Sequence, residues 1–213
     1  MSFISSGAIE NARVLAAKNI AIMVDAIRQG YHVVTAEPSA ALCLTREYPN
    51  LFSGEDVELV SKNTSEACHY LWQLHLRGQL ELDFKPLNTT IGYHTPCHTK
   101  AIAADAPAKN LLNLIPGLTV RALDKGCSGM AGTYGLKQEN YRNSLRAGWP
   151  LISAIREPQL QLGSTECSTC KMQMEQGTTK PTVHPLKLMA LSYGLMPEIM
   201  TKLTTPGEDL YIT

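Results

Sequence analysis

The sequence predicts an α/β protein in which parallel sheets are built from two related βαβ-type modules. Two observations support this fold class. Short β-branched runs alternate along the chain with longer segments whose apolar residues recur every three or four positions, the pattern of strands alternating with helices. The sequence also repeats itself, because three short matches occur in the same order about 129 residues apart.

The three matches fall at equivalent points of a helix–strand–turn unit. They join residues 10–13 to 139–142, residues 26–28 to 154–156, and residues 35–40 to 165–170. We therefore expect a first module at residues 1–88 and a second at residues 89–213. In this alignment Glu37 and Ala40 stand where the second copy has a pair of cysteines, so we expect the first module to be degenerate.

The first module is expected to start with a long helix. Its expected elements are a largely buried helix over residues 9–29, a parallel strand over 31–36, and helices over 40–48 and 64–77. The strand assignment depends on the β-branched run YHVVTA, which is typical of an interior parallel strand. The three helices are expected to end at Gly30, Pro49 and Gly78, because glycine often caps a helix and proline interrupts one.

The second module repeats this alternation. Its expected elements are strands over residues 89–94, 118–123 and 161–165, helices over 97–114 and 137–156, a helix starting near 167–170, an extended piece at 181–185 and a helix over 186–193. Parallel strands joined by helices release their following loops at one edge of the sheet. We therefore expect the residues that follow each strand to converge at that edge.

Composition and charge exclude several classes of protein. The chain has 19 basic and 19 acidic residues, so its formal charge is zero and nothing points to nucleic acid. No apolar run reaches the roughly 18 residues of a membrane-spanning helix, and the N-terminus lacks a secretory signal pattern. We expect a cytoplasmic protein, and peripheral attachment at the inner face of a membrane stays open. In that compartment cysteines indicate metal, redox or buried thiols rather than disulfides.

Four of the six cysteines follow the strands of the second module. Cys97 follows the first strand, Cys127 follows the second within the glycine-rich stretch DKGCSGMAGTYG, and Cys167 and Cys170 form a CxxC pair after the third. The glycines allow the backbone there to make close approaches and to adopt positive φ. Converging thiolates suit tetrahedral zinc or an iron–sulfur cluster. We therefore predict that these four sulfurs form one metal or cluster site.

Other candidate residues are expected to have supporting or structural parts. His94 and His98 flank the first of the four cysteines, and we expect them to hydrogen-bond a thiolate rather than to ligate a metal. Cys43 and Cys68 lie in helix-like segments and are expected to be core thiols. His184 is expected to be a structural histidine.

Three motifs of the second module resemble the CCG cysteine-rich domain family. They are YHTPCH at residues 93–98, CSGMAGTYG at 127–135 and CSTCKMQ at 167–173. This family includes the B subunit of heterodisulfide reductases and iron–sulfur subunits of flavin-dependent glycerol 3-phosphate, glycolate and lactate dehydrogenases. Ser128 departs from the family pattern, because it stands where the family has the second cysteine of CCG. The five thiols that the family uses are therefore reduced to four.

The resemblance implies an electron-transfer component of an oxidoreductase, and it leaves open whether the chain is an enzyme by itself. Cys97, Cys127, Cys167 and Cys170 would hold a cluster of the 4Fe–4S type. A flavoprotein dehydrogenase subunit or domain would supply the electrons, and a quinone or another carrier of a membrane-associated complex would accept them. Two alternatives stay open. In the first, the same four thiolates would hold zinc in a structural or docking module that has no redox role. In the second, the CxxC pair would act as a thiol redox site.

Overall fold

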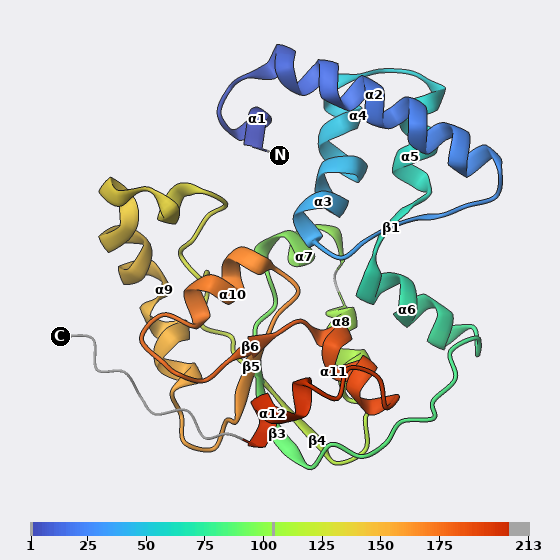
Figure 1. Ribbon diagram of the computed structural model, residues 1–213. Coiled ribbons are helices and arrows are strands. Elements are labelled where there is room, and N and C mark those ends of the chain that lie inside the picture. Colours follow the sequence, from blue (N-terminus) through green and yellow to red (C-terminus); the bar gives the residue numbers. More distant parts are fainter. Residues whose placement is uncertain (1, 104, 205–213) are drawn as a thin grey trace. The chain divides into compact units, whose positions relative to one another are not determined.

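The computed structural model describes residues 2–103 and 105–204, and it divides the chain into two compact units (Figure 1). Unit 1 is Met1–Tyr70 and unit 2 is Leu71–Thr213. All strand pairs in the described residues are parallel, which confirms the α/β class. Within the same residues, no helix is both long and apolar enough to cross a bilayer. The modules expected at residues 1–88 and 89–213 are defined by the sequence repeat, whereas the two units are defined by contacts. The two modules therefore stay a prediction.

Unit 1 contains several helices and a two-stranded parallel sheet. Its elements are α1 (Ser2–Ser5), α2 (Ile9–Arg28), β1 (Val33–Thr35), α3 (Pro38–Leu42), the π-helix η1 (Cys43–Glu47), α4 (Tyr48–Leu51), α5 (Glu55–Lys62), β2 (Thr64–Glu66) and the start of α6 (Ala67–Leu76), which continues into unit 2. Every fourth residue of α2, from Ala12 to Val24, is buried and faces the core. Its other faces carry exposed Val14, Leu15 and Ile22, so the expectation that this helix is buried on most faces is wrong.

Three further expectations for unit 1 are wrong, each for a physical reason. The run at residues 31–36 does not form an interior strand, because β1 belongs to a sheet of only two strands and Val34 is 44% exposed. Pro49 does not end the helix, because α4 begins at Tyr48 and places the proline in a first turn, where its missing N–H needs no partner. Residues 64–66 form β2 instead of the first turn of a helix, because they pair with β1 from Val33 onward. Tertiary pairing overrides the local helical pattern at this point.

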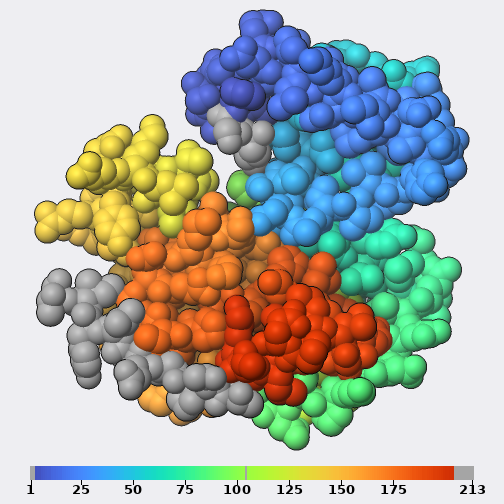
Figure 2. Space-filling view, in the orientation of Figure 1, coloured from blue at the N-terminus to red at the C-terminus, as the bar shows by residue number. Residues whose placement is uncertain are grey.

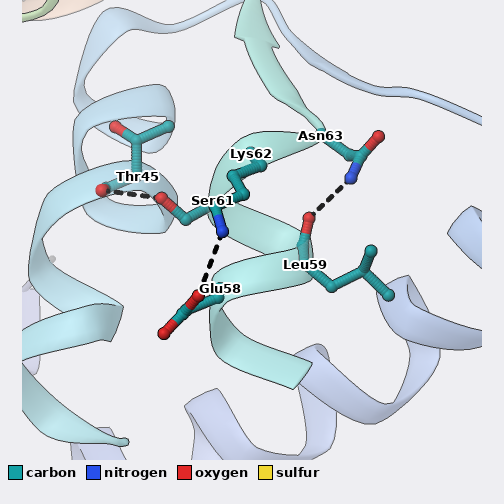
Figure 3. Close-up of polar contacts among 6 residues, drawn as sticks. All are labelled: Thr45, Glu58, Leu59, Ser61, Lys62 and Asn63. Atoms are coloured by element: carbon teal, nitrogen blue, oxygen red, sulfur yellow. Dashed lines mark hydrogen bonds and ion pairs between the residues drawn. The ribbon is translucent and has the colours of Figure 1, made fainter. Parts of the chain in front are cut away.

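Side-chain hydrogen bonds fix the C-terminal end of α5 (Figure 3). Asn63 donates from Nδ2 to the carbonyl oxygen of Leu59 at 2.8 Å, and its backbone N–H donates to the same carbonyl at 3.1 Å, so this carbonyl in the last turn of the helix has two donors. Ser61 donates from Oγ to the carbonyl of Thr45 in η1 at 3.0 Å. These two bonds attach α5 to the strand that follows it and to the π-helix beside it.

An Asn63→Ala variant is expected to lose about 1 kcal/mol of unfolding free energy, because the partly buried Leu59 carbonyl loses one of its two hydrogen bonds. The matched control is Lys62→Ala, which removes an exposed ion pair to Glu58 (Nζ to Oε2, 3.0 Å). That exposed pair contributes little, so the control is expected to change stability by less than about 0.5 kcal/mol. Urea unfolding of both variants measures the difference, and equal effects would contradict the capping role of Asn63.

Unit 2 contains a four-stranded parallel sheet in the order β4-β3-β5-β6. Its elements are β3 (Thr89–Tyr93), α7 (Cys97–Ile102), α8 (Pro107–Leu112), β4 (Leu118–Ala122), the 3₁₀ turns η2 (Tyr134–Leu136) and η3 (Gln138–Asn140), α9 (Tyr141–Ile155), β5 (Leu162–Ser164), α10 (Ser168–Met174), β6 (Thr182–Val183), α11 (Pro185–Ser192) and α12 (Ile199–Thr204). Helices α9 and α10 pack together on one side of the sheet, and α8 and α11 on the other (Figure 1). The apolar side chains between these layers form the core.

Most elements of unit 2 match the expected ranges, two differ, and α12 was not expected. The helix expected over 97–114 is split into α7 and α8, because Pro107 starts a new helix and Ala106 before it adopts a left-handed conformation (φ 40°). Helix α7 has already ended before this point, because its C-cap Ala103 is extended (φ −139°, ψ 127°). The helix expected over 137–156 begins only at Tyr141, after two 3₁₀ turns.

The two units share a local arrangement that supports the proposed duplication. Helix–strand–helix occurs as α2–β1–α3 in unit 1 and as α9–β5–α10 in unit 2. Glu37 is the N-cap of α3 with φ −112° and ψ 123°, and its repeat partner Cys167 is the N-cap of α10 with φ −97° and ψ 121°. Equivalent residues therefore have nearly the same backbone conformation. Common origin of the two modules remains a hypothesis.

Candidate cysteine site

The four predicted cysteines all lie at the carboxyl edge of the unit 2 sheet. Cys97 is the first residue of α7, after β3, and Cys127 lies in the loop after β4. Cys167 caps α10, after β5, and Cys170 lies within that helix. Because β3, β4 and β5 run parallel, their following loops leave the sheet at the same edge.

Electrostatic interactions connect these thiols across the three loops. Burial raises the pKa of Cys97, and the negative charge of Cys127, a hydrogen bond to that thiol and the charge of Cys167 raise it further. Cys127 also contributes to the raised pKa of Cys170. Each loop thus places a sulfur within electrostatic range of sulfurs from the others, as the topology predicts.

Cys167 and Cys170 form the most strongly interacting pair. Cys170 donates a hydrogen bond to Cys167, and this bond, helped by Thr169 and opposed by burial, lowers the pKa of Cys167 to about 5. The same bond and burial raise the pKa of Cys170. Both residues are buried, with 8% and 7% of their surface exposed. The hydrogen bond from Cys170 therefore favours the thiolate form of Cys167, and the thiolate is the form that binds metals.

The glycine-rich loop holds Cys127 against helix α9. The N–H of Gly129 donates to the sulfur of Cys127 at 3.3 Å, and the Gly129 carbonyl accepts a hydrogen bond from Ser144 Oγ at 2.9 Å. Gly129 has a φ of +86°, and a Cβ there would lie 2.1 Å from the Ser144 carbonyl oxygen. Only glycine fits this position, for both reasons. Figure 2 shows the segment after this loop, in yellow, as a lobe beside the orange segment that contains α10.

Ser128 points its hydroxyl at the site. Its Oγ donates to the sulfur of Cys170 at 3.2 Å, and only 2% of the residue is exposed. Its carbonyl oxygen packs against Gly148 of α9, where a Cβ would lie only 2.1 Å away. Ser128 therefore contacts the site as a hydrogen-bond donor.

The three histidines differ in their surroundings. His94 is buried, and burial lowers its pKa to about 4, although a backbone hydrogen bond at Leu123 acts in the other direction. Its Nε2 atom is buried and has no hydrogen-bond partner. His98 is half-buried beside the site. His184 accepts a hydrogen bond at Nδ1 from the N–H of Leu186 at 3.1 Å and caps α11, which is the structural role expected for it.

The described side chains do not form a preassembled ion site. Among residues 2–103 and 105–204, no group of three or more His, Cys, Asp or Glu side chains is placed so that it could hold a metal ion. Cys97 and Cys127 are exposed, so their side chains can reorient without disturbing the core. Cys43 and Cys68, by contrast, are buried in unit 1, as expected for core thiols.

The donor set fits a soft metal or an iron–sulfur cluster. All four donors are thiols, and thiolate ligands are the preferred partners of such centres. The segments that follow β3 and β5 also contain buried polar atoms without a hydrogen-bond partner: His94 Nε2, Thr99 Oγ1 and Thr165 Oγ1. Buried polar atoms of this kind call for a partner, which a bound group or its ordered surroundings would supply.

Several supporting residues escaped the sequence reasoning. Tyr93 donates from its hydroxyl to Oε1 of buried Glu166 at 2.8 Å, linking the end of β3 to the residue before Cys167. Thr169 is hydrogen-bonded to Cys167 at 3.2 Å. Tyr93 and Thr169 lie within the motifs that carry the family resemblance, so the motifs could have indicated them. Nothing in the sequence marks Ser144 of α9.

A Tyr93→Phe variant is expected to lose about 1.5–3 kcal/mol of unfolding free energy, because a carboxyl group that is buried loses a hydroxyl donor. The control is Tyr134→Phe in the same unit, where 42% of the side chain is exposed and the expected change is within about 0.5 kcal/mol. Urea unfolding monitored by circular dichroism compares the two. A Tyr93→Phe chain as stable as the control would contradict a contribution of this bond.

Comparison with protein families identifies the class to which this site corresponds. Residues 91–175 match the model of the family described as "Cysteine-rich domain", CCG. The matched range contains Cys97, Cys127, Cys167 and Cys170, the strands β4 and β5, and the end of β3 from residue 91 onward. The resemblance predicted from the three cysteine motifs is thereby confirmed.

Two curated relatives extend the similarity beyond that range. Both are the C subunit of anaerobic glycerol-3-phosphate dehydrogenase, one from Escherichia coli strain K12 and one from Escherichia coli O157:H7. Each is 35% identical over 188 residues, which cover 88% of this chain and 47% of the relative. The chain therefore spans about half the length of the relatives that it matches.

Proposed function

We propose that this chain is an electron-transfer component in which Cys97, Cys127, Cys167 and Cys170 hold an iron–sulfur cluster. The observation that carries the proposal is that the range matching the CCG family contains four thiols at one sheet edge. A bound cluster would supply one-electron chemistry. Four cysteines are the usual ligand set of a 4Fe–4S or 2Fe–2S centre, and we favour the 4Fe–4S type.

The surrounding residues would hold and orient the sulfurs. Thr169 and the N–H of Gly129 are hydrogen-bonded to two of them, Cys167 and Cys127. Hydrogen bonds to ligating sulfurs stabilise their negative charge and are one of the ways in which a protein sets a cluster potential. Buried His94 stays neutral at physiological pH, because burial lowers its pKa to about 4, and its unpartnered Nε2 is available as a further contact.

The partners follow from the relatives' name, which describes one component of a dehydrogenase with several subunits. We propose that a flavoprotein dehydrogenase subunit or domain delivers electrons to the cysteine site. A quinone or another carrier of a membrane-associated complex would then accept them, with the chain at the cytoplasmic face. The exposure of Cys97 and Cys127 supports this assignment, because it brings the site close to a surface that a partner can reach.

Purification without oxygen tests the proposal. We expect iron and inorganic sulfide in equal amounts, together with broad visible absorbance that dithionite bleaches and a paramagnetic signal in the reduced protein. About one zinc per chain, with no uptake of iron or sulfide on reconstitution, would instead identify the structural zinc site. Thiols that bind no metal under either condition would contradict both assignments.

A further inference from the structure

We propose that the Ser128 hydroxyl, by donating a hydrogen bond to the sulfur of Cys170, raises the reduction potential of the bound cluster. This inference rests on the proposed function and concerns the same site. Its basis is the hydrogen bond from Ser128 Oγ to Cys170 Sγ, which is 3.2 Å long. Only 2% of the surface of Ser128 is exposed. A hydroxyl is a poor ligand for soft metals, so Ser128 acts as a donor rather than as a fifth ligand.

The backbone that follows the Ser128 side chain is fixed by helix α9. The carbonyl oxygen of Ser128 packs against Gly148, where a Cβ would lie 2.1 Å away. The next carbonyl, that of Gly129, accepts a hydrogen bond from Ser144 Oγ at 2.9 Å. Ser144 and Gly148 both belong to α9, so one helix holds the loop at two consecutive residues. The hydroxyl therefore has little freedom to turn away from the site.

The acceptor is attached to the same helix. Gln173 of α10 donates from Nε2 to Ser144 Oγ at 3.2 Å, and α10 is also the helix that contains Cys170. The loop with the donor and the helix with the acceptor are thus both bonded to one serine of α9. All of these groups are buried, with Ser144 and Gln173 each 1% exposed. The distance between the Ser128 hydroxyl and the Cys170 sulfur is therefore a property of the packed core.

A bond of this kind changes the relative stability of two oxidation states. Reduction adds one electron to the centre and increases the negative charge on the ligating sulfurs. A fixed donor stabilises the more negative state more strongly, and burial enlarges the effect because the local dielectric constant is low. Removing the donor is therefore expected to make the potential more negative without removing a ligand.

The experiment compares Ser128→Ala with the unaltered chain, both purified without oxygen and reconstituted with iron and sulfide. We expect the variant and the unaltered chain to contain the same amounts of iron and sulfide. We expect the equilibrium constant of reduction to fall about tenfold in the variant, which corresponds to a reduction potential about 59 mV more negative for one electron. Redox titration followed by visible absorbance and paramagnetic resonance measures it. The matched control is Ser192→Ala, a fully buried serine of α11 whose hydroxyl donates to the Met189 carbonyl at 2.7 Å. Its potential is expected to equal that of the unaltered chain.

The possible outcomes separate this inference from the function on which it rests. An unaltered chain that takes up no iron would contradict both. A Ser128→Ala chain with a full cluster and an unshifted potential would overturn the inference alone. Loss of the cluster from a folded Ser128→Ala chain would show a ligand or scaffold role and would also overturn it. Ser128→Gly removes the same hydroxyl and serves as the second variant. Failure of both variants to fold would assign the hydroxyl to stability and reject the proposal.

Discussion

A Cys167→Ser variant, purified without oxygen and supplied with iron and sulfide, is expected to retain less than about a tenth of the iron of the unaltered chain. Cys167 is the N-cap of α10, and it is hydrogen-bonded to Thr169. Serine keeps nearly the same volume and can form the same kind of hydrogen bond, so the helix start is preserved. Its hydroxyl binds soft metals poorly, so the loss falls on the ligand set rather than on the fold.

The control for this variant is Cys43→Ser, because Cys43 is also buried and is part of the core of unit 1. The same exchange of sulfur for oxygen there is expected to leave the iron content unchanged. Elemental analysis and visible absorbance measure the cluster, and the urea midpoint shows whether each chain is folded. A Cys167→Ser chain that keeps its iron, or a Cys43→Ser chain that loses it while folded, would contradict the proposed ligand set.

The fold class could be predicted because parallel βαβ units leave a strong local signal. Strand β3 was expected to within one residue, and its β-branched and aromatic residues are typical of a buried strand. Strand β2 could not be predicted, because residues 64–66 continue a helical pattern and become a strand only by pairing with β1. The split between α7 and α8 is different, because Pro107 was a readable signal for it.

The position of the four cysteines in the fold could be predicted from topology. Parallel strands release their loops at one edge, so cysteines that follow successive strands lie at that edge, and their joint role as ligands stays a prediction. The contacts that hold the glycine-rich loop depend on the packing of α9. No sequence motif indicates that this helix has small residues, Ser144 and Gly148, on the face that contacts the loop. The loop glycines predicted that the backbone there packs closely against another part of the chain. The structure shows that this part is helix α9.

Gly148→Ala tests that contact directly, and it is expected to lower the unfolding free energy by about 2–3 kcal/mol. Helix propensity alone predicts the opposite sign, because alanine in a helix interior is favoured over glycine by about 1 kcal/mol. Sterics outweigh propensity here, since the new Cβ would lie 2.1 Å from the carbonyl oxygen of Ser128 and 3.0 Å from Gln173 Nε2. The first contact involves backbone, so no side-chain rotation relieves it.

Relief of this clash requires the loop and α9 to separate, and the loop contains Cys127. We therefore expect the Gly148→Ala chain to hold less iron under conditions in which it is still folded. The control is Gly132→Ala in the same loop, where φ is +66° and a Cβ would have no atom within 4 Å. That variant has only the cost of a left-handed backbone, about 1–2 kcal/mol, and its iron content is expected to be unchanged. If both variants lose stability equally and keep their iron, α9 does not position the sulfur of the loop, and the hydroxyl of Ser128 is not fixed against Cys170.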